Sequence, residues 1–293
     1  MNARQLGALV LLSALWGVSY LFIRVAVPQL GPFFLMGLRV ALAVLALTLY
    51  AVAISRLPKF RGRLRQFLAL GTVNSAIPFS LIAIAEIELP ASLAAILNST
   101  TALFVAGVAA LWIRETLTVT KVAGLLLGII GVAALMGWTP LPLTGAVLLS
   151  VGAMLAASLS YAVGGVYAKR TFEGVPSLTM AIGQQTGAAV VLLPLAAANV
   201  PDRVPSPTAA LSVLGLALLS TTVAYLLYFY LIRTAGPTKT LTVTFLIPAF
   251  GLFFGVVFLD EPVGPGTFAG LCIILASVAL VNGIHPWRRK IKA

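Results

Sequence analysis

Residues 6–27 read LGALVLLSALWGVSYLFIRVAV, an apolar stretch in which Arg24 is the one charged side chain. An α-helix rises about 1.5 Å per residue and needs about 20 apolar residues to cross the hydrocarbon core of a bilayer. The stretch is too long for the apolar part of a secretory signal, it contains Trp16, and it lacks a small-residue cleavage pattern. It is therefore predicted to be the first membrane-spanning helix of the mature chain.

Nine further stretches of the same kind follow within the 293 residues. Backbone groups cannot stay unpaired in lipid, so each stretch is expected to be helical. The predicted fold is an all-α membrane protein with ten transmembrane helices. The ten expected spans are residues 6–27, 33–54, 67–87, 91–113, 122–138, 143–167, 177–197, 209–232, 240–259 and 267–284.

The composition agrees with this fold. Apolar residues make up 60% of the chain and charged residues 9%, whereas a soluble domain carries about 25% charged residues. The net charge of +12 does not indicate nucleic-acid binding, because the basic residues fall in short segments between apolar stretches and form no stripe with aromatic residues. Cys272 is the single cysteine, so no intramolecular disulfide can form.

The basic residues also predict an orientation. If the N-terminus is cytoplasmic, the inside segments hold 16 of the 19 Lys and Arg residues. The positive-inside rule then places both termini in the cytoplasm, and the multi-pass chain is expected in an inner or plasma membrane. The inside residues are Arg4, Arg56, Lys59, Arg61, Arg63, Arg65, Arg114, Lys121, Lys169, Arg170, Arg233, Lys239, Arg288, Arg289, Lys290 and Lys292.

A shift of 146 residues aligns the chain with itself. It matches Phe104 with Phe250 and Glu115 with Glu261. Five spans separate the matched positions, so the second copy is expected to have the opposite orientation in the membrane. The predicted organisation is two inverted five-helix repeats, residues 1–140 and 141–293. Two such halves can open a central site to one side and then to the other, which is alternating access.

Two motifs support a family resemblance. Leu15-Trp16-Gly17 lies in the first span, and Arg114-Glu115-Thr116-Leu117-Thr118 precedes a fifth span with Gly124, Gly128 and Gly131. The whole chain resembles the drug/metabolite transporter superfamily, specifically its EamA-like ten-helix exporters, and within these the bacterial amino-acid exporters of the YddG type. The resemblance implies export of amino acids or related metabolites through a central cavity. The second copy departs from the motifs, so they do not specify the substrate.

Five aromatic residues are candidates for lining that cavity. Trp16 and Tyr20 share one helix face, Tyr225 and Tyr228 share another, and Tyr161 takes the place of Trp16 in the second copy. Aromatic walls suit an apolar or aromatic side chain, and polar ring tips can meet an amino or carboxyl group. The alternative is that these rings form interfacial belts or fill gaps between helices.

Neutral polar residues and prolines within spans complete the candidate site. Asn74, Asn98 and Thr244 come from three spans, and Asn98 corresponds to Thr244 under the repeat shift. Such residues commonly bridge packed helices, and the cavity interpretation is favoured only for Asn98. Pro78 and Pro248 interrupt spans and are candidates for gating kinks, with static kinks as the alternative.

Ionisable residues in spans require an explanation because each costs roughly 2.5–3.5 kcal/mol at the bilayer centre. Arg24 and Arg39 could hold a substrate carboxylate, but snorkelling or bonding to helix ends is the favoured interpretation. Glu86 near an outer helix end is the one acidic residue within a span. The hypothesis is therefore transport down the substrate gradient, or ion coupling through an unrecognised group. Glu115 and Glu261 are expected to cap the helices that follow them.

The remaining residues argue against an enzyme. One histidine, His285, one cysteine and no mid-span carboxylate leave no catalytic or metal site, so no cofactor is expected. The expected partners are a small-molecule substrate and the lipid bilayer, and the chain can act as a monomer. The alternatives are a carrier of another metabolite or a non-transporting sensor or scaffold, although no loop is long enough to form a soluble domain.

Overall fold

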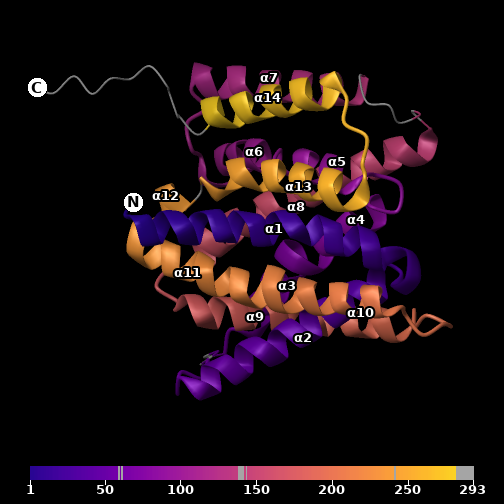
Figure 1. The fold of residues 1–293 in the computed structure, drawn as a ribbon. Coiled ribbons are helices and arrows are strands. Elements are labelled where there is room, and N and C mark those ends of the chain that lie inside the picture. The colour runs from indigo at the N-terminus through magenta and orange to yellow at the C-terminus, as the bar shows by residue number, and fades with distance from the viewer. Residues whose placement is uncertain (59, 61, 138–141, 143, 241, 282–293) are drawn as a thin grey trace, which may run out of the picture.

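The computed structural model describes residues 1–58, 60, 62–137, 142, 144–240 and 242–281, and this part of the chain folds into helices without strands (Figure 1). Several predictions fall outside the described residues: the expected ends of the fifth and tenth spans, the expected start of the sixth span, the boundary at residues 140 and 141, His285 and six of the inside basic residues. The helices are α1 (Ala3–Leu30), α2 (Pro32–Ala53), α3 (Leu64–Gly71), η1 (Thr72–Ala76), α4 (Ile77–Ala85), α5 (Ala91–Asn98), α6 (Thr101–Ile113), α7 (Val119–Gly137), α8 (Gly145–Thr171), α9 (Ser177–Ala197), α10 (Pro207–Leu214), η2 (Gly215–Val223), α11 (Ala224–Ala235), α12 (Pro237–Thr240), α13 (Val243–Leu259) and α14 (Pro265–Val281).

These elements confirm a ten-helix membrane protein. Within the described residues, eight helical segments are long and apolar enough to cross a membrane, and α13 and α14 are two shorter apolar helices. Three of the eight are composite: α3, η1 and α4 form one, α5 and α6 another, and α10, η2 and α11 a third. Large apolar side chains on the outside of the bundle, such as Leu111 and Leu149, are exposed as lipid-facing residues should be.

The first helix is longer at both ends than its apolar stretch. Asn2 and Gln5 form a capping box, in which the Asn2 side chain accepts from the Gln5 N–H at 2.9 Å and the Gln5 side chain accepts from the Asn2 N–H at 3.0 Å. At the other end Gly31 has a φ of +69° and Pro32 begins α2, so the chain turns sharply there.

Helices from distant parts of the sequence pack in pairs. Figure 1 shows α7 beside α14 at one edge of the bundle, α1 beside α13 in the middle, and α2 near α9 at the opposite edge. Small residues allow close approach: a Cβ at Gly17 would clash with Phe250 of α13, and one at Gly251 would clash with Ala95 of α5. The α13–α14 linker lies at the end of the bundle opposite the N-terminus.

Replacing Gly71 with alanine is expected to destabilise the bundle by about 1–3 kcal/mol or more. A Cβ there would meet backbone atoms of Gln184, Gly187 and Ala188 in α9, which no side-chain rotation can relieve. The measurement is thermal unfolding of both variants in detergent. Gly165→Ala is the matched control, because a Cβ at Gly165 meets nothing within 4 Å. Equal melting temperatures for the two variants would contradict the close α3–α9 packing.

Two spans contain a wide π-helical segment near their centre. The segment η1 ends two residues before Pro78. In η2 the hydroxyls of Thr221 and Thr222 donate to carbonyls five residues earlier, at 2.9 and 3.0 Å. Such segments often occur at functional sites because they redirect side chains and free carbonyl groups. Pro248 lies inside α13, which continues as one helix. The gating role of Pro78 and Pro248 stays a prediction.

Candidate substrate site

Arg39 lies in the interior of the bundle, two turns into α2, and only 6% of it is exposed. Its Nε–H donates to the Thr221 hydroxyl oxygen at 3.0 Å, and its guanidinium carbon lies 3.7 Å from the centroid of the Phe79 ring. This is a cation–π contact between α2 and α4, combined with a hydrogen bond to η2. The favoured expectation of snorkelling or helix-end bonding is therefore wrong for Arg39, because its charge is held inside the bundle by side chains from two other spans.

Arg24 behaves as expected. One terminal nitrogen of its guanidinium donates to the backbone oxygens of Glu86 and Ile87, the latter at 2.9 Å. These carbonyls follow the last residue of α4, where a helix leaves carbonyl groups unpaired. Arg24 thus ties α1 to the end of α4 and carries no sign of a substrate role.

A second polar network lies on neighbouring elements. The Gln184 amide nitrogen donates to the Ser75 hydroxyl and the Tyr225 hydroxyl, both at 2.8 Å, and the Gln184 amide oxygen accepts from Asn74 at 3.2 Å. Asn74 and Ser75 belong to η1, and Tyr225 follows η2 by one residue in α11. The segment η1 and the start of α11 therefore present polar side chains to α9, and two of the predicted site residues, Asn74 and Tyr225, share one network.

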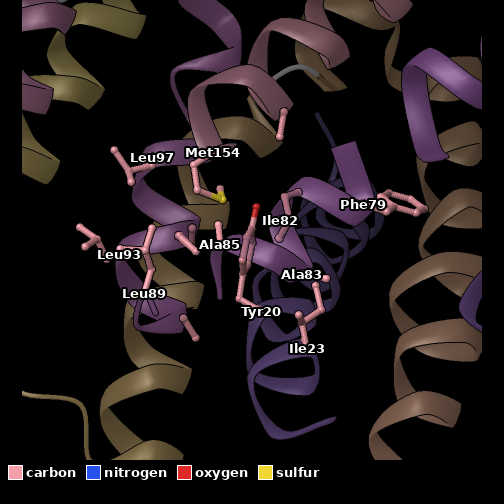
Figure 2. Close-up of a cluster of buried hydrophobic side chains, with 14 of the residues drawn as sticks. Tyr20, Ile23, Phe79, Ile82, Ala83, Ala85, Leu89, Leu93, Leu97 and Met154 are labelled. Carbon is pink, nitrogen blue, oxygen red and sulfur yellow. The ribbon is translucent and has the colours of Figure 1, made fainter. Parts of the chain in front are cut away.

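Aromatic rings surround Arg39. Tyr161 meets Phe79 edge to face at a centroid distance of 6.4 Å, and the hydroxyls of Tyr20, Tyr161 and Tyr225 are close enough to interact with the Arg39 charge. Tyr20 is buried, and Figure 2 shows its hydroxyl directed towards Met154 of α8. Three of the predicted aromatic residues thus gather around a cation that was not among the predicted site residues.

The other two predicted aromatic residues form a separate group. Trp16 and Tyr228 lie 5.7 Å apart between centroids and pack with apolar residues of α1, α11 and α13. Phe229 contacts both Tyr228 and Tyr225, at 5.6 and 5.9 Å, so it links this pair to the Gln184 network. Trp16 and Tyr228 therefore neighbour the Arg39 surroundings without contacting the charge.

Asn98 and Thr244 lie apart from the Gln184 network, on α5 and α13. The side-chain oxygen of Asn98 is buried and accepts no hydrogen bond within the described residues. Thr244 is half-buried. An open hollow of about 370 Å³ is lined by Thr242, Phe245, Leu246, Leu275 and Ala279, and Thr244 is not among its lining residues. That hollow offers one hydroxyl and no charge, so the Arg39 surroundings are the better candidate for recognising a polar substrate.

Glu261 has a partner that the sequence does not indicate. Its two carboxylate oxygens accept from the backbone N–H groups of Ala91 at 2.6 Å and Ser92 at 2.9 Å. It therefore caps α5 and not the helix that follows it, which corrects the expectation. Its counterpart Glu115 instead pairs with Lys121 at 2.6 Å, and this hydrogen bond holds the pKa of Glu115 below its usual range. We call the end of the bundle that carries Arg24, Glu86 and Glu261 the Glu86 end.

The chain can now be compared with known proteins. The sequence profile described as the EamA-like transporter family matches residues 5–137 and 148–283. The chain belongs to this family. It is accordingly a membrane transporter of small metabolites and not an enzyme, with a small-molecule substrate and a lipid environment.

Individual relatives agree with this family assignment, and a solved structure agrees with the fold. The chain is 29% identical to the uncharacterized transporter YvbV of Bacillus subtilis, with 94% of this chain and 90% of the relative covered. It is 28% identical to the uncharacterized inner membrane transporter YedA of Escherichia coli (96% and 93% covered) and 27% identical to a probable amino-acid metabolite efflux pump of Salmonella typhimurium (94% and 94% covered). A crystal structure with 18% identity shares the fold, with a TM-score of 0.69 over 97% of this chain and 98% of the other.

Proposed function

We propose that the protein exports small carboxylates, in the first place amino acids with apolar or aromatic side chains, and that Arg39 holds the substrate carboxylate. The main evidence for this proposal is which nitrogens of Arg39 have bonding partners. Its Nε–H is used by Thr221 and one face of its guanidinium by Phe79, while its terminal nitrogens make no hydrogen bond within the described residues. A guanidinium with two free parallel N–H groups is suited to bind a carboxylate in bidentate geometry.

The surroundings support this substrate class. Tyr20, Phe79 and Tyr161 offer rings against which an apolar or aromatic side chain can pack, and the Gln184 network offers amide and hydroxyl groups to an ammonium. The name of the Salmonella relative, a probable amino-acid metabolite efflux pump, favours the same class, as does the proposed kinship with exporters of the YddG type. Trp16, Tyr228, Asn98 and Thr244 are placed at the periphery of the proposed site.

The transport cycle that we propose is alternating access between two inverted five-helix repeats, residues 1–140 and 141–293. The distribution of basic residues favours cytoplasmic termini in a bacterial inner membrane, so the Glu86 end faces outward. Two residues tie that end together: Arg24 joins α1 to the α4–α5 loop, and Glu261 joins the α13–α14 linker to the start of α5. Breaking these bonds is the step that releases substrate to the outside.

Efflux from liposomes tests the proposed function. Purified protein is reconstituted into liposomes preloaded with labelled amino acids and with the amines that lack their carboxylates, and protein-free liposomes serve as the control. Selective, saturable release of apolar and aromatic amino acids, with no release of the amines, is the expected result. Equal release of the amines would show that Arg39 does not bind the substrate carboxylate. If only another metabolite were released, with or without a pH gradient, that metabolite and not an amino acid would be the substrate.

A further inference from the structure

Glu86 is a fully buried acidic residue that the sequence places near a helix end. It follows the last residue of α4, its exposed fraction is 0%, and neither carboxylate oxygen has a hydrogen-bond partner within the described residues. An ionised carboxylate without donors is very costly away from water. The geometry therefore requires that Glu86 is neutral, with a proton bound, while the Glu86 end has the structure described above.

The charged and titratable groups around Glu86 come from three other elements. Arg24 and Tyr20 lie on α1, Arg39 on α2, and Glu261 in the α13–α14 linker. One terminal nitrogen of Arg24 donates to the backbone oxygens of Glu86 and Ile87. The Nε–H of Arg39 donates to Thr221, and its guanidinium lies on the Phe79 ring. Within the described residues neither arginine lies within ion-pair distance of the Glu86 carboxylate.

Burial is the main cause that raises the pKa of Glu86 well above its usual range. The negative charge of Glu261 raises it further, and the charges of Arg24 and Arg39 act in the opposite direction. The pKa is raised in the closed arrangement and returns towards its ordinary value once water reaches the side chain. A proton is therefore bound on closing and released on opening.

We propose that Glu86 is a proton-binding site of the transport cycle, and that proton uptake by Glu86 closes the outer end of the bundle. The proposal rests on the proposed transport function and supplies the coupling group that the sequence does not identify. Low external pH favours the closed end. The open end gains as pH rises from the ordinary pKa of a glutamate towards the raised pKa of the closed form, and the gain levels off above the raised pKa. Arg24 binds the carbonyls of Glu86 and Ile87, and Glu261 binds the start of α5 a few residues further on. Ionisation of the Glu86 carboxylate therefore pushes apart the segments that these bonds hold.

Thiol accessibility tests the proposal without any substrate. Cys272 is first replaced by alanine, and Ser92→Cys then introduces an almost isosteric reporter at a position that is 4% exposed at the closed end. A membrane-impermeant maleimide is applied to reconstituted protein across a pH series. The labelling rate of a cysteine in an unfolded peptide is measured at each pH and used to correct for ionisation of the thiol. Because one proton is released, the accessible fraction is expected to rise with pH by up to tenfold per unit.

Two further variants decide the outcome. Glu86→Gln keeps the size of the side chain and mimics the protonated acid, so labelling should stay low and lose its dependence on pH. Glu88→Gln removes an exposed carboxylate two residues away and should keep the original profile. An unchanged profile in Glu86→Gln would overturn the proposal, and gel filtration of each variant verifies that it is folded. Because labelling needs no substrate, a failed efflux assay and a failed proton site are distinguishable.

Discussion

Replacement of Arg39 by lysine is expected to reduce transport about 10- to 100-fold, because hydrogen bonds to a charged group are worth about 1.5–3 kcal/mol. Lysine keeps the positive charge. It loses the planar face that lies on Phe79, the Nε–H that binds Thr221 and the paired N–H groups proposed to bind a carboxylate. The measurement is the initial rate of efflux from liposomes at several substrate concentrations.

Arg24→Lys is the matched control for that experiment. Arg24 also lies within a span, but it uses one terminal nitrogen to bind backbone oxygens, and an ammonium can make the same bonds. We expect transport close to that of the unaltered protein. If both lysine variants transported equally well, the charge of Arg39 alone would be sufficient and bidentate binding would be ruled out.

Much of the fold follows from hydropathy, whereas the helix ends depend on local bonds that hydropathy does not report. Ten apolar stretches predict ten helices because lipid admits few other structures. The start of α1 is missed because Asn2 and Gln5 cap the helix with polar side chains before the apolar residues begin. The segments η1 and η2 are missed because hydropathy is the same for α- and π-helical turns.

The site is predicted less completely, because it depends on contacts between spans. Tyr20, Tyr161, Tyr225 and Asn74 can be selected as mid-span aromatic or polar residues. Whether Arg39 snorkels or stays inside depends on Thr221, which is 182 positions away in the chain.

Glu86 and Glu261 show the same limit. A glutamate at the end of an apolar stretch resembles an ordinary surface residue, yet Glu86 is fully buried. Glu261 precedes one helix in the sequence and caps a different one in space. No pattern along the chain distinguishes these cases.

Replacement of Glu261 by glutamine is expected to open the Glu86 end. The carboxylate accepts two backbone N–H groups of α5, whereas an amide offers one oxygen and directs its own N–H groups at a donor. Losing a charged acceptor costs about 1.5–3 kcal/mol, which shifts the balance towards the open end about 10- to 100-fold. Hydrogen exchange of the Ala91 and Ser92 amides should accelerate by that factor, because those two N–H groups lose their acceptors.

Two comparisons make this result specific to the Glu86 end. Glu115→Gln changes the corresponding residue of the first copy, which forms only a partly exposed ion pair with Lys121, so the exchange of Ala91 and Ser92 should not change. Gly255→Ala places a Cβ where the Glu261 carboxylate lies and should therefore accelerate exchange in the same way as Glu261→Gln. Equal protection of Ala91 and Ser92 in all three variants would show that Glu261 does not hold this end closed, and the proposed outer gate would have to be assigned to Arg24 and the packing of Gly251 on Ala95.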